Sequence, residues 1–111
     1  MKNFVQKGEN LTLAAPYDRT SGQGALIGSI FGVASLDVLS GVEAAFVTEG
    51  VFDLTKVGSQ AWTVGAKIYW DDTNKRCTNS SSGNTLIGVA TKAVGSGAGE
   101  TTGRVKLGIV A

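Results

Sequence analysis

The fold class of this chain is decided by one stretch, Lys67-Ile68-Tyr69-Trp70-Asp71-Asp72-Thr73-Asn74-Lys75-Arg76-Cys77-Thr78. Its first part, residues 67–70, is rich in aromatic and β-branched side chains and strongly favours a strand. Residues 71–75 are dominated by Asp and Asn, which are typical of turns because their side chains bond to nearby backbone. A second short strand follows at residues 76–78. We therefore predict a β-hairpin over residues 67–78.

Short apolar or alternating segments, punctuated by glycine, continue on both sides of this hairpin. In Val42, Ala44 and Phe46 the apolar side chains recur every second residue, as they do on one face of a strand. No glycine-free segment of about twelve residues carries the spacing of an amphipathic helix. The other predicted strands are residues 11–13, the apolar run Ala25–Val33 interrupted by Gly28 and Gly32, residues 51–54 after a break at Gly50, Thr85–Val94 and Gly103–Val110. One helical turn is expected near Val33–Leu39, where Ala34, Leu36 and Leu39 could pack.

These segments predict an all-β fold, a compact single-domain β-sandwich or β-barrel of short strands. Residues 1–111 form the single domain, and residues 1–10 form an extended N-terminal arm. Only 7% of the residues are aromatic, so the core consists largely of Ala and Val. A homo-oligomer would add the burial that such a thin core lacks.

Composition excludes several kinds of chemistry. The chain has no histidine and one cysteine, Cys77, so a zinc site, a Ser–His or Cys–His pair and an intrachain disulfide are not expected. We predict no catalytic residues, no cofactor and no metal. A net charge of +1 gives too weak an electrostatic attraction to hold nucleic acid or an anionic membrane, and neither is expected as a partner. The N-terminus lacks a secretory pattern, so we expect the protein to be made and kept in a cytosol.

Two motifs imitate active sites. The glycine-rich loop at residues 95–102 resembles a phosphate cradle, but Glu100 stands where a P-loop requires lysine, and a strand pattern follows instead of a helix. We interpret it as a hairpin connection. Asp71 and Asp72 form the one adjacent pair of carboxylates. Neighbouring turn residues point apart, so we expect turn formation by their side chains rather than acid–base catalysis or calcium binding.

The aromatic residues near the hairpin suggest contacts. Trp62, Tyr69 and Trp70 could form a stacking platform for single-stranded nucleic acid, but Asp71 and Asp72 cancel the nearby basic charge. Because neighbours on a strand face opposite ways, we expect one of Tyr69 and Trp70 in the core and the other at an interface. The predicted interaction residues are Phe4, Val5 and Lys7 in the arm, together with Trp62 and Trp70.

The order of these segments resembles a family of small phage structural proteins, the capsid cement or head-decoration proteins. The similarity spans nearly the whole chain, and its most specific part is Gly-Val-Phe-Asp-Leu at residues 50–54 followed by the Tyr-Trp-Asp of residues 69–71. The other matching segments are residues 1–8, Leu11-Thr12-Leu13-Ala14-Ala15-Pro16, Gly22-Gln23-Gly24-Ala25-Leu26-Ile27-Gly28, Leu86-Ile87-Gly88-Val89-Ala90 and Val105-Lys106-Leu107.

This resemblance implies a virion protein that binds the outside of an icosahedral phage head, where major capsid subunits meet, often as a trimer. The major capsid protein is the implied partner. A tail, fibre or baseplate module is the alternative, and a single-stranded nucleic-acid-binding domain is a less favoured one. Within the cement hypothesis, residues 1–10 could add an edge strand to a neighbouring subunit. Pairing of the arm within its own sheet is equally open.

Overall fold

The computed structural model describes residues 10–28 and 30–108, which contain nine β-strands and no helix. One sheet contains β1 (Asn10–Ala14), β2 (Gly24–Ile27), β3 (Ile30–Ala34) and β4 (Glu43–Val47). The other contains β5 (Gly50–Thr55), β6 (Lys67–Asp71), β7 (Arg76–Thr78), β8 (Thr85–Ala90) and β9 (Thr102–Leu107). The all-β class predicted from the sequence is confirmed.

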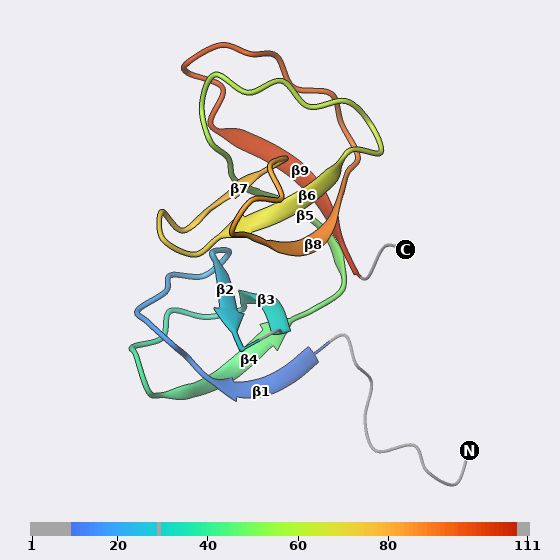
Figure 1. The fold of residues 1–111 in the computed structure, drawn as a ribbon. Helices are drawn as coiled ribbons and strands as arrows, with labels where there is room; N and C mark the ends of the chain where they lie inside the picture. Colours follow the sequence, from blue (N-terminus) through green and yellow to red (C-terminus); the bar gives the residue numbers. More distant parts are fainter. Residues whose placement is uncertain (1–9, 29, 109–111) are drawn as a thin grey trace, which may run out of the picture.

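The two sheets divide the chain into an N-terminal and a C-terminal half, stacked one above the other in Figure 1. The strand order is β1-β4-β3-β2 in the first sheet and β5-β9-β8-β6-β7 in the second, and all named pairs are antiparallel. The second sheet curls until its two edges meet. There, a parallel bridge joins Lys56 to Cys77, and the Val57 N–H donates to the Cys77 carbonyl at 3.0 Å. The architecture therefore combines a sandwich with a nearly closed small barrel.

The main core lies between the sheets and inside the curl of the second one. Phe31 and Val33 of β3 pack there against residues of the five-stranded sheet, and the rings of Phe31 and Trp70 lie 5.0 Å apart between centroids. A second, smaller cluster around Phe46, Ala25 and Ala34 covers the opposite face of the four-stranded sheet. Strand β3 is thus covered on both faces.

The hairpin predicted at residues 67–78 is confirmed as β6 and β7. Trp70 pairs with Cys77 and Asp71 with Arg76. The Asp71 carboxylate accepts hydrogen bonds from the backbone N–H groups of Thr73 at 3.1 Å and Asn74 at 3.3 Å, so it forms the expected turn. Cys77 is fully buried, as expected for a small strand residue.

The apolar run Ala25–Val33 is not one strand, and this prediction was wrong. Ile27 pairs with Ile30, and Gly28 has a φ of +62°, so the chain reverses there and forms a β2–β3 hairpin. Both faces of this hairpin are covered: Ile27 packs on the smaller cluster and Leu26 on the main core. Because both faces of this hairpin are buried, its sequence is continuously apolar, and no alternation of polar and apolar residues marks the turn.

The helical turn expected at Val33–Leu39 is also absent. Residues up to Ala34 belong to β3, and the Val38 N–H and carbonyl both pair with Arg19, at 2.9 Å each. Leu36 and Leu39, which were expected to pack, are exposed. The backbone groups of this loop bond to a neighbouring loop rather than to each other, so the helical pattern does not form.

The last two strands pair as predicted, with shorter bounds. Strand β8 ends at Ala90 rather than Val94, and β9 ends at Leu107, while residues 109–111 lie outside the described part. The loops at residues 56–66 and 91–101 lie side by side at the upper end in Figure 1. They are joined by the Trp62–Val94 bridge and by the Ser59 N–H, which donates to the Gly97 carbonyl at 3.1 Å.

Candidate interaction surfaces

The structure separates the predicted interaction residues into two groups. Phe4, Val5 and Lys7 lie outside the described residues. Trp62 and Trp70 are only 1% and 2% exposed, so in the single chain they belong to the core and leave little surface for a partner. The large apolar side chains that are exposed on the described surface, and so available to a partner, belong to other residues.

Trp62 fills the interior of the curled second sheet. Its ring packs so tightly on Gly103 that a β-carbon there would lie 2.1 Å from Cζ3 of the ring. Its Nε1 donates to the Gln60 side-chain carbonyl at 2.8 Å, and the Gln60 amide donates to the Thr78 hydroxyl at 3.0 Å. Trp62 is therefore a structural residue that connects the barrel interior to the β7 edge.

Trp70 takes part in a polar junction between the two sheets. Asp72 Oδ1 accepts hydrogen bonds from Trp70 Nε1 at 3.0 Å and from the Tyr17 hydroxyl at 2.8 Å. The same Tyr17 oxygen accepts the backbone N–H of Leu26 at 3.1 Å. Lys75 lies over the Tyr17 ring at 4.2 Å from its centroid and forms an ion pair with Asp72 at 3.6 Å. Through Tyr17 and Asp72, the β6–β7 turn is bonded to the β1–β2 loop and to β2 of the first sheet.

The pKa values at this junction follow from its contacts. Burial raises the pKa of Tyr17, so its hydroxyl stays protonated and available as a donor. Burial alone would raise the pKa of Asp72 as well, but the donors Tyr17 and Trp70 and the charge of Lys75 outweigh it and lower that pKa. Asp72 thus remains an ionised acceptor, a role that its position in a turn did not reveal.

Lys56 is the one buried charged residue among those described. Its Nζ donates to the carbonyls of Val57 at 2.7 Å and Glu100 at 3.1 Å, and it lies 5.5 Å from the Trp62 ring centroid. Burial lowers the pKa of Lys56, and the Glu100 carboxylate partly opposes this. Because both contacts are to backbone, Lys56 attaches the residue 95–102 loop to the barrel.

That loop does not form a phosphate cradle. The Glu100 carboxylate turns back and accepts the Gly95 N–H at 3.2 Å, which places a negative charge where a phosphate would need donors. Across residues 10–28 and 30–108, no group of three or more Cys, Asp or Glu side chains is arranged to hold a metal ion. No helix in that part of the chain is long and apolar enough to cross a membrane.

Exposed apolar side chains gather at one end of the first sheet. The loops 15–22 and 35–42, called the tip below, lie together at the left of Figure 1 beyond the Ala14 end of β1. Leu36 and Leu39 are each 67% exposed there, and Val42 is also exposed. Large apolar side chains presented together on a loop are a common feature of contact sites.

The two loops of the tip are cross-linked by hydrogen bonds. The Ser40 N–H donates to Asp18 Oδ1 and the Ser21 N–H to Asp37 Oδ1, both at 2.8 Å. The Gly41 N–H donates to the Ala15 carbonyl at 2.8 Å, in addition to the Arg19–Val38 pairing. These bonds fix the loops relative to each other, so the exposed leucines are held in place before any partner binds.

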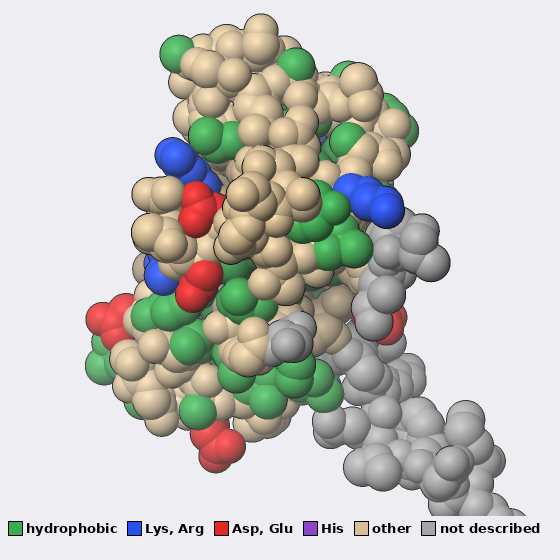
Figure 2. Space-filling view, viewed as in Figure 1, with side chains coloured by type: hydrophobic (Ala, Val, Ile, Leu, Met, Phe, Trp, Pro, Cys, Tyr) green, Lys and Arg blue, Asp and Glu red, His purple; other side chains and the backbone are tan. Residues whose placement is uncertain are grey.

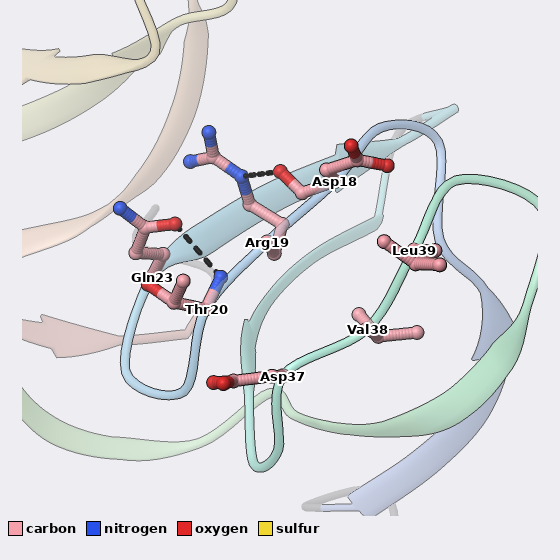
Figure 3. Close-up of a pocket in the computed structure, with 7 residues that line it drawn as sticks. All are labelled: Asp18, Arg19, Thr20, Gln23, Asp37, Val38 and Leu39. Carbon is pink, nitrogen blue, oxygen red and sulfur yellow. Dashed lines mark hydrogen bonds between the residues drawn. The ribbon is translucent and has the colours of Figure 1, made fainter.

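A groove of about 340 Å³ runs between the loops of the tip (Figure 3). Val38 and Leu39 line one side, Asp18 and Thr20 the other, and Asp37 lies at one end. The guanidinium of Arg19 points away from the two apolar side chains and lies 4.9 Å from the Tyr17 ring centroid. The groove therefore offers an apolar wall with carboxylates beside it.

The net charge of +1 conceals a strong asymmetry between the two sheets. Residues 10–49 carry four carboxylates against one cation, Arg19. Residues 50–108 carry seven Lys or Arg side chains against four carboxylates. On the face shown in Figure 2, acidic and basic side chains lie close together in the middle of the molecule, and the lowest charged side chains are acidic. The tip itself carries two carboxylates, Asp18 and Asp37, and one cation, Arg19, within this carboxylate-rich half.

The described part of the molecule is an all-β fold with a buried core and exposed apolar side chains on the tip. A family model described as phage cement protein matches residues 5–107, and the chain belongs to that family. This confirms the resemblance found in the sequence. No curated protein matches the chain. Nor does any solved structure. The family makes this chain a structural component of a phage capsid.

Proposed function

We propose that this protein binds the outer surface of an icosahedral phage head and cements the junctions between major capsid subunits. The observation that carries the proposal is the family match over residues 5–107, nearly the whole chain. The major capsid protein is then the partner, and the assembled virion surface is the location. Synthesis in the host cytoplasm precedes assembly.

The structure supports a binding role through its surface. Its carboxylate-rich half is joined to a half that is richer in cations, and a cross-linked loop pair presents exposed leucines. Many copies on one symmetric shell would each need only modest affinity, because contacts to neighbouring subunits act together. The nucleic-acid alternative finds little support here, since Trp62 and Trp70 are buried and cannot form a stacking platform without unfolding.

The arm is the proposed contact between neighbouring subunits. Among the described strands, β1 has a partner on one side only, β4, and the arm joins β1 at this edge strand. The open edge of β1 could accept a strand from another subunit without rearrangement of the sheet, and residues 1–9 precede this strand in the sequence.

Head binding by the arm can be measured by co-sedimentation. Purified heads lacking this protein are mixed with the full chain or with a variant in which residues 2–8 are deleted, and bound protein is measured in the pellet. We expect saturable binding of the full chain and a large loss for the deletion variant, with an unchanged thermal unfolding midpoint. Equal binding of both proteins would remove the arm from the contact, and no binding of either would remove the head-surface role.

A further inference from the structure

We propose that the tip binds the N-terminal segment, residues 2–7, of a second copy of this chain. The tip combines three features of a peptide-binding surface: exposed leucines, a groove and a surplus of carboxylates. The inference concerns contacts between copies, so it goes beyond head binding and can hold whether or not the assembly binds a head.

The chemistry of the segment matches that of the tip. Residues 2–7 read Lys-Asn-Phe-Val-Gln-Lys, so two apolar residues stand between two cations. Phe4 and Val5 complement the exposed Leu36 and Leu39. The cations Lys2 and Lys7 complement Asp18 and Asp37, which line the groove together with Leu39. Glu43 follows the tip at the start of β4 and adds a further carboxylate.

Other occupants fit this surface less well. Two tips brought together would place carboxylates against carboxylates, which disfavours a symmetric contact between identical tips. The one cation of this region, Arg19, does not neutralise the groove wall, because its side chain is engaged elsewhere. Its Nε donates to the Asp18 carbonyl at 2.8 Å, and Nη1 donates to the Gly24 carbonyl at 3.3 Å.

Topology favours the arm of a second copy over the chain's own arm. Strand β1 pairs Asn10 with Val47 at one end and Ala14 with Glu43 at the other. The arm continues from Asn10, whereas the tip lies beyond Ala14, at the opposite end of the strand. A five-residue strand spans roughly 16 Å. The chain's own arm would have to reverse direction and cross that length first, while the arm of a neighbour can approach the tip directly.

A contact of arm to tip is heterologous, because the two copies contribute different surfaces. Such contacts close into a ring when the rotation between copies allows it. The trimer expected from the family resemblance would be a ring of three arm-to-tip contacts. Each copy would then contribute one arm and one tip, and the ring would leave none of either unpaired.

Sedimentation velocity of the full chain across a concentration series tests the apolar half of the contact. We expect reversible association, weakened by roughly tenfold or more in the double variant Leu36→Ser/Leu39→Ser, because exposed anchors are lost. The matched control is Val64→Ser, which removes a side chain that is 69% exposed on the other sheet and should not change association. A full chain that stays monomeric, or a double variant that associates normally, would overturn the proposal.

The charge variant Lys2→Glu/Lys7→Glu provides a second test that leaves the folded domain untouched. It should weaken association, and more so at low salt. Disulfide trapping then identifies the pair of copies. A mixture of Asn3→Cys and Ser40→Cys chains, which keep Phe4 and Leu39, should give a cross-linked heterodimer, while the buried Cys77 stays unreacted. A cross-link that forms only within a single chain carrying both substitutions would assign the tip to the chain's own arm and overturn the proposal. If the protein bound heads while remaining strictly monomeric, the arm-to-tip contact would be overturned, but the proposed head-binding role would stand.

Discussion

Replacing Tyr17 by Phe tests whether the polar junction holds the two sheets together. The change removes a single oxygen, which donates to Asp72 at 2.8 Å and accepts the Leu26 N–H at 3.1 Å. The aromatic ring stays, and so does its contact with Lys75. Any loss of stability therefore reports on the two hydrogen bonds rather than on packing.

The expected loss of stability depends on which hydrogen-bond partners Asp72 and Leu26 keep in the variant. Asp72 keeps the hydrogen bond from Trp70 and the charge of Lys75, so it is not left without partners. The half-buried Leu26 N–H loses the acceptor that the hydroxyl provided. Losing one hydrogen bond to a charged group and one between neutral groups costs about 2–4.5 kcal/mol, and partial exposure places the loss of stability for Tyr17→Phe near the lower end of that range. For a domain of about 100 residues, each kcal/mol lowers Tm by about 4–8 °C.

Urea unfolding at neutral pH measures this loss, and Tyr69→Phe is the matched control. Tyr69 is also partly buried, but its hydroxyl forms no hydrogen bond recorded among the described residues, so its removal should change the free energy of unfolding by less than about 0.5 kcal/mol. The difference in the free energy of unfolding between the natural protein and Tyr17→Phe should also become smaller in acid. The pKa of Asp72 is lowered from 3.8 by folding, so its contribution is present above pH 3.8 and is lost as the pH falls below it. Equal effects of the two substitutions would refute a linking role for the Tyr17 hydroxyl.

Two further predictions concern the core. Gly103→Ala should lower the free energy of unfolding by about 1–3 kcal/mol, because a β-carbon 2.1 Å from the Trp62 ring forces the ring or β9 to move. Gly99→Ala, where an added β-carbon meets nothing within 4 Å, should be neutral in the same thermal unfolding measurement, and equal losses would contradict the tight contact. Burial raises the pKa of Cys77 from 9.0 to about 12, so the stability from its protonated thiol is present below pH 9 and lost as the pH rises toward 12. Unfolding between pH 8 and 11 should show a steeper loss in the natural protein than in Cys77→Ala. Parallel curves would contradict this, since Tyr17 and Lys56 titrate in both proteins.

The local patterns in the sequence predicted those parts of the fold that depend on near neighbours. Residues 67–78 combine β-prone side chains with Asp and Asn, and both halves of the hairpin depend on contacts within a few residues. Trp70 entered the core as the alternation of strand side chains predicts. The break expected at Gly50 lies just before it: residues 48 and 49 separate β4 from β5, Gly50 is the first residue of β5, and the two strands belong to different sheets.

What the sequence did not predict depends on distant contacts. The turn at Gly28 lies inside an apolar run, because the β2–β3 hairpin is covered on both faces and shows no alternation. Leu36 and Leu39 have a helical spacing, yet their loop bonds to residues near Arg19, which lie far away in sequence. The junction of Tyr17 with Asp72 spans 55 positions, and no local pattern indicates it.

The burial of the two predicted interaction residues of the described chain, Trp62 and Trp70, also depends on distant contacts. Trp62 and Trp70 are large aromatic residues, which are common both at interfaces and in cores, and composition does not distinguish the two. In this chain the second sheet curls around them. The tip instead presents three exposed apolar residues, Leu36, Leu39 and Val42. The cross-linking of its two loops by Asp18 and Asp37 becomes visible only in three dimensions.

The central claim, attachment to the head as a capsid cement, is tested most directly by electron cryomicroscopy of heads decorated with this protein. The account predicts ordered density for a two-sheet domain on the outer surface, repeated at the junctions between major capsid subunits. Density confined to the tail or baseplate, or heads that remain bare at saturating protein concentration, would contradict it.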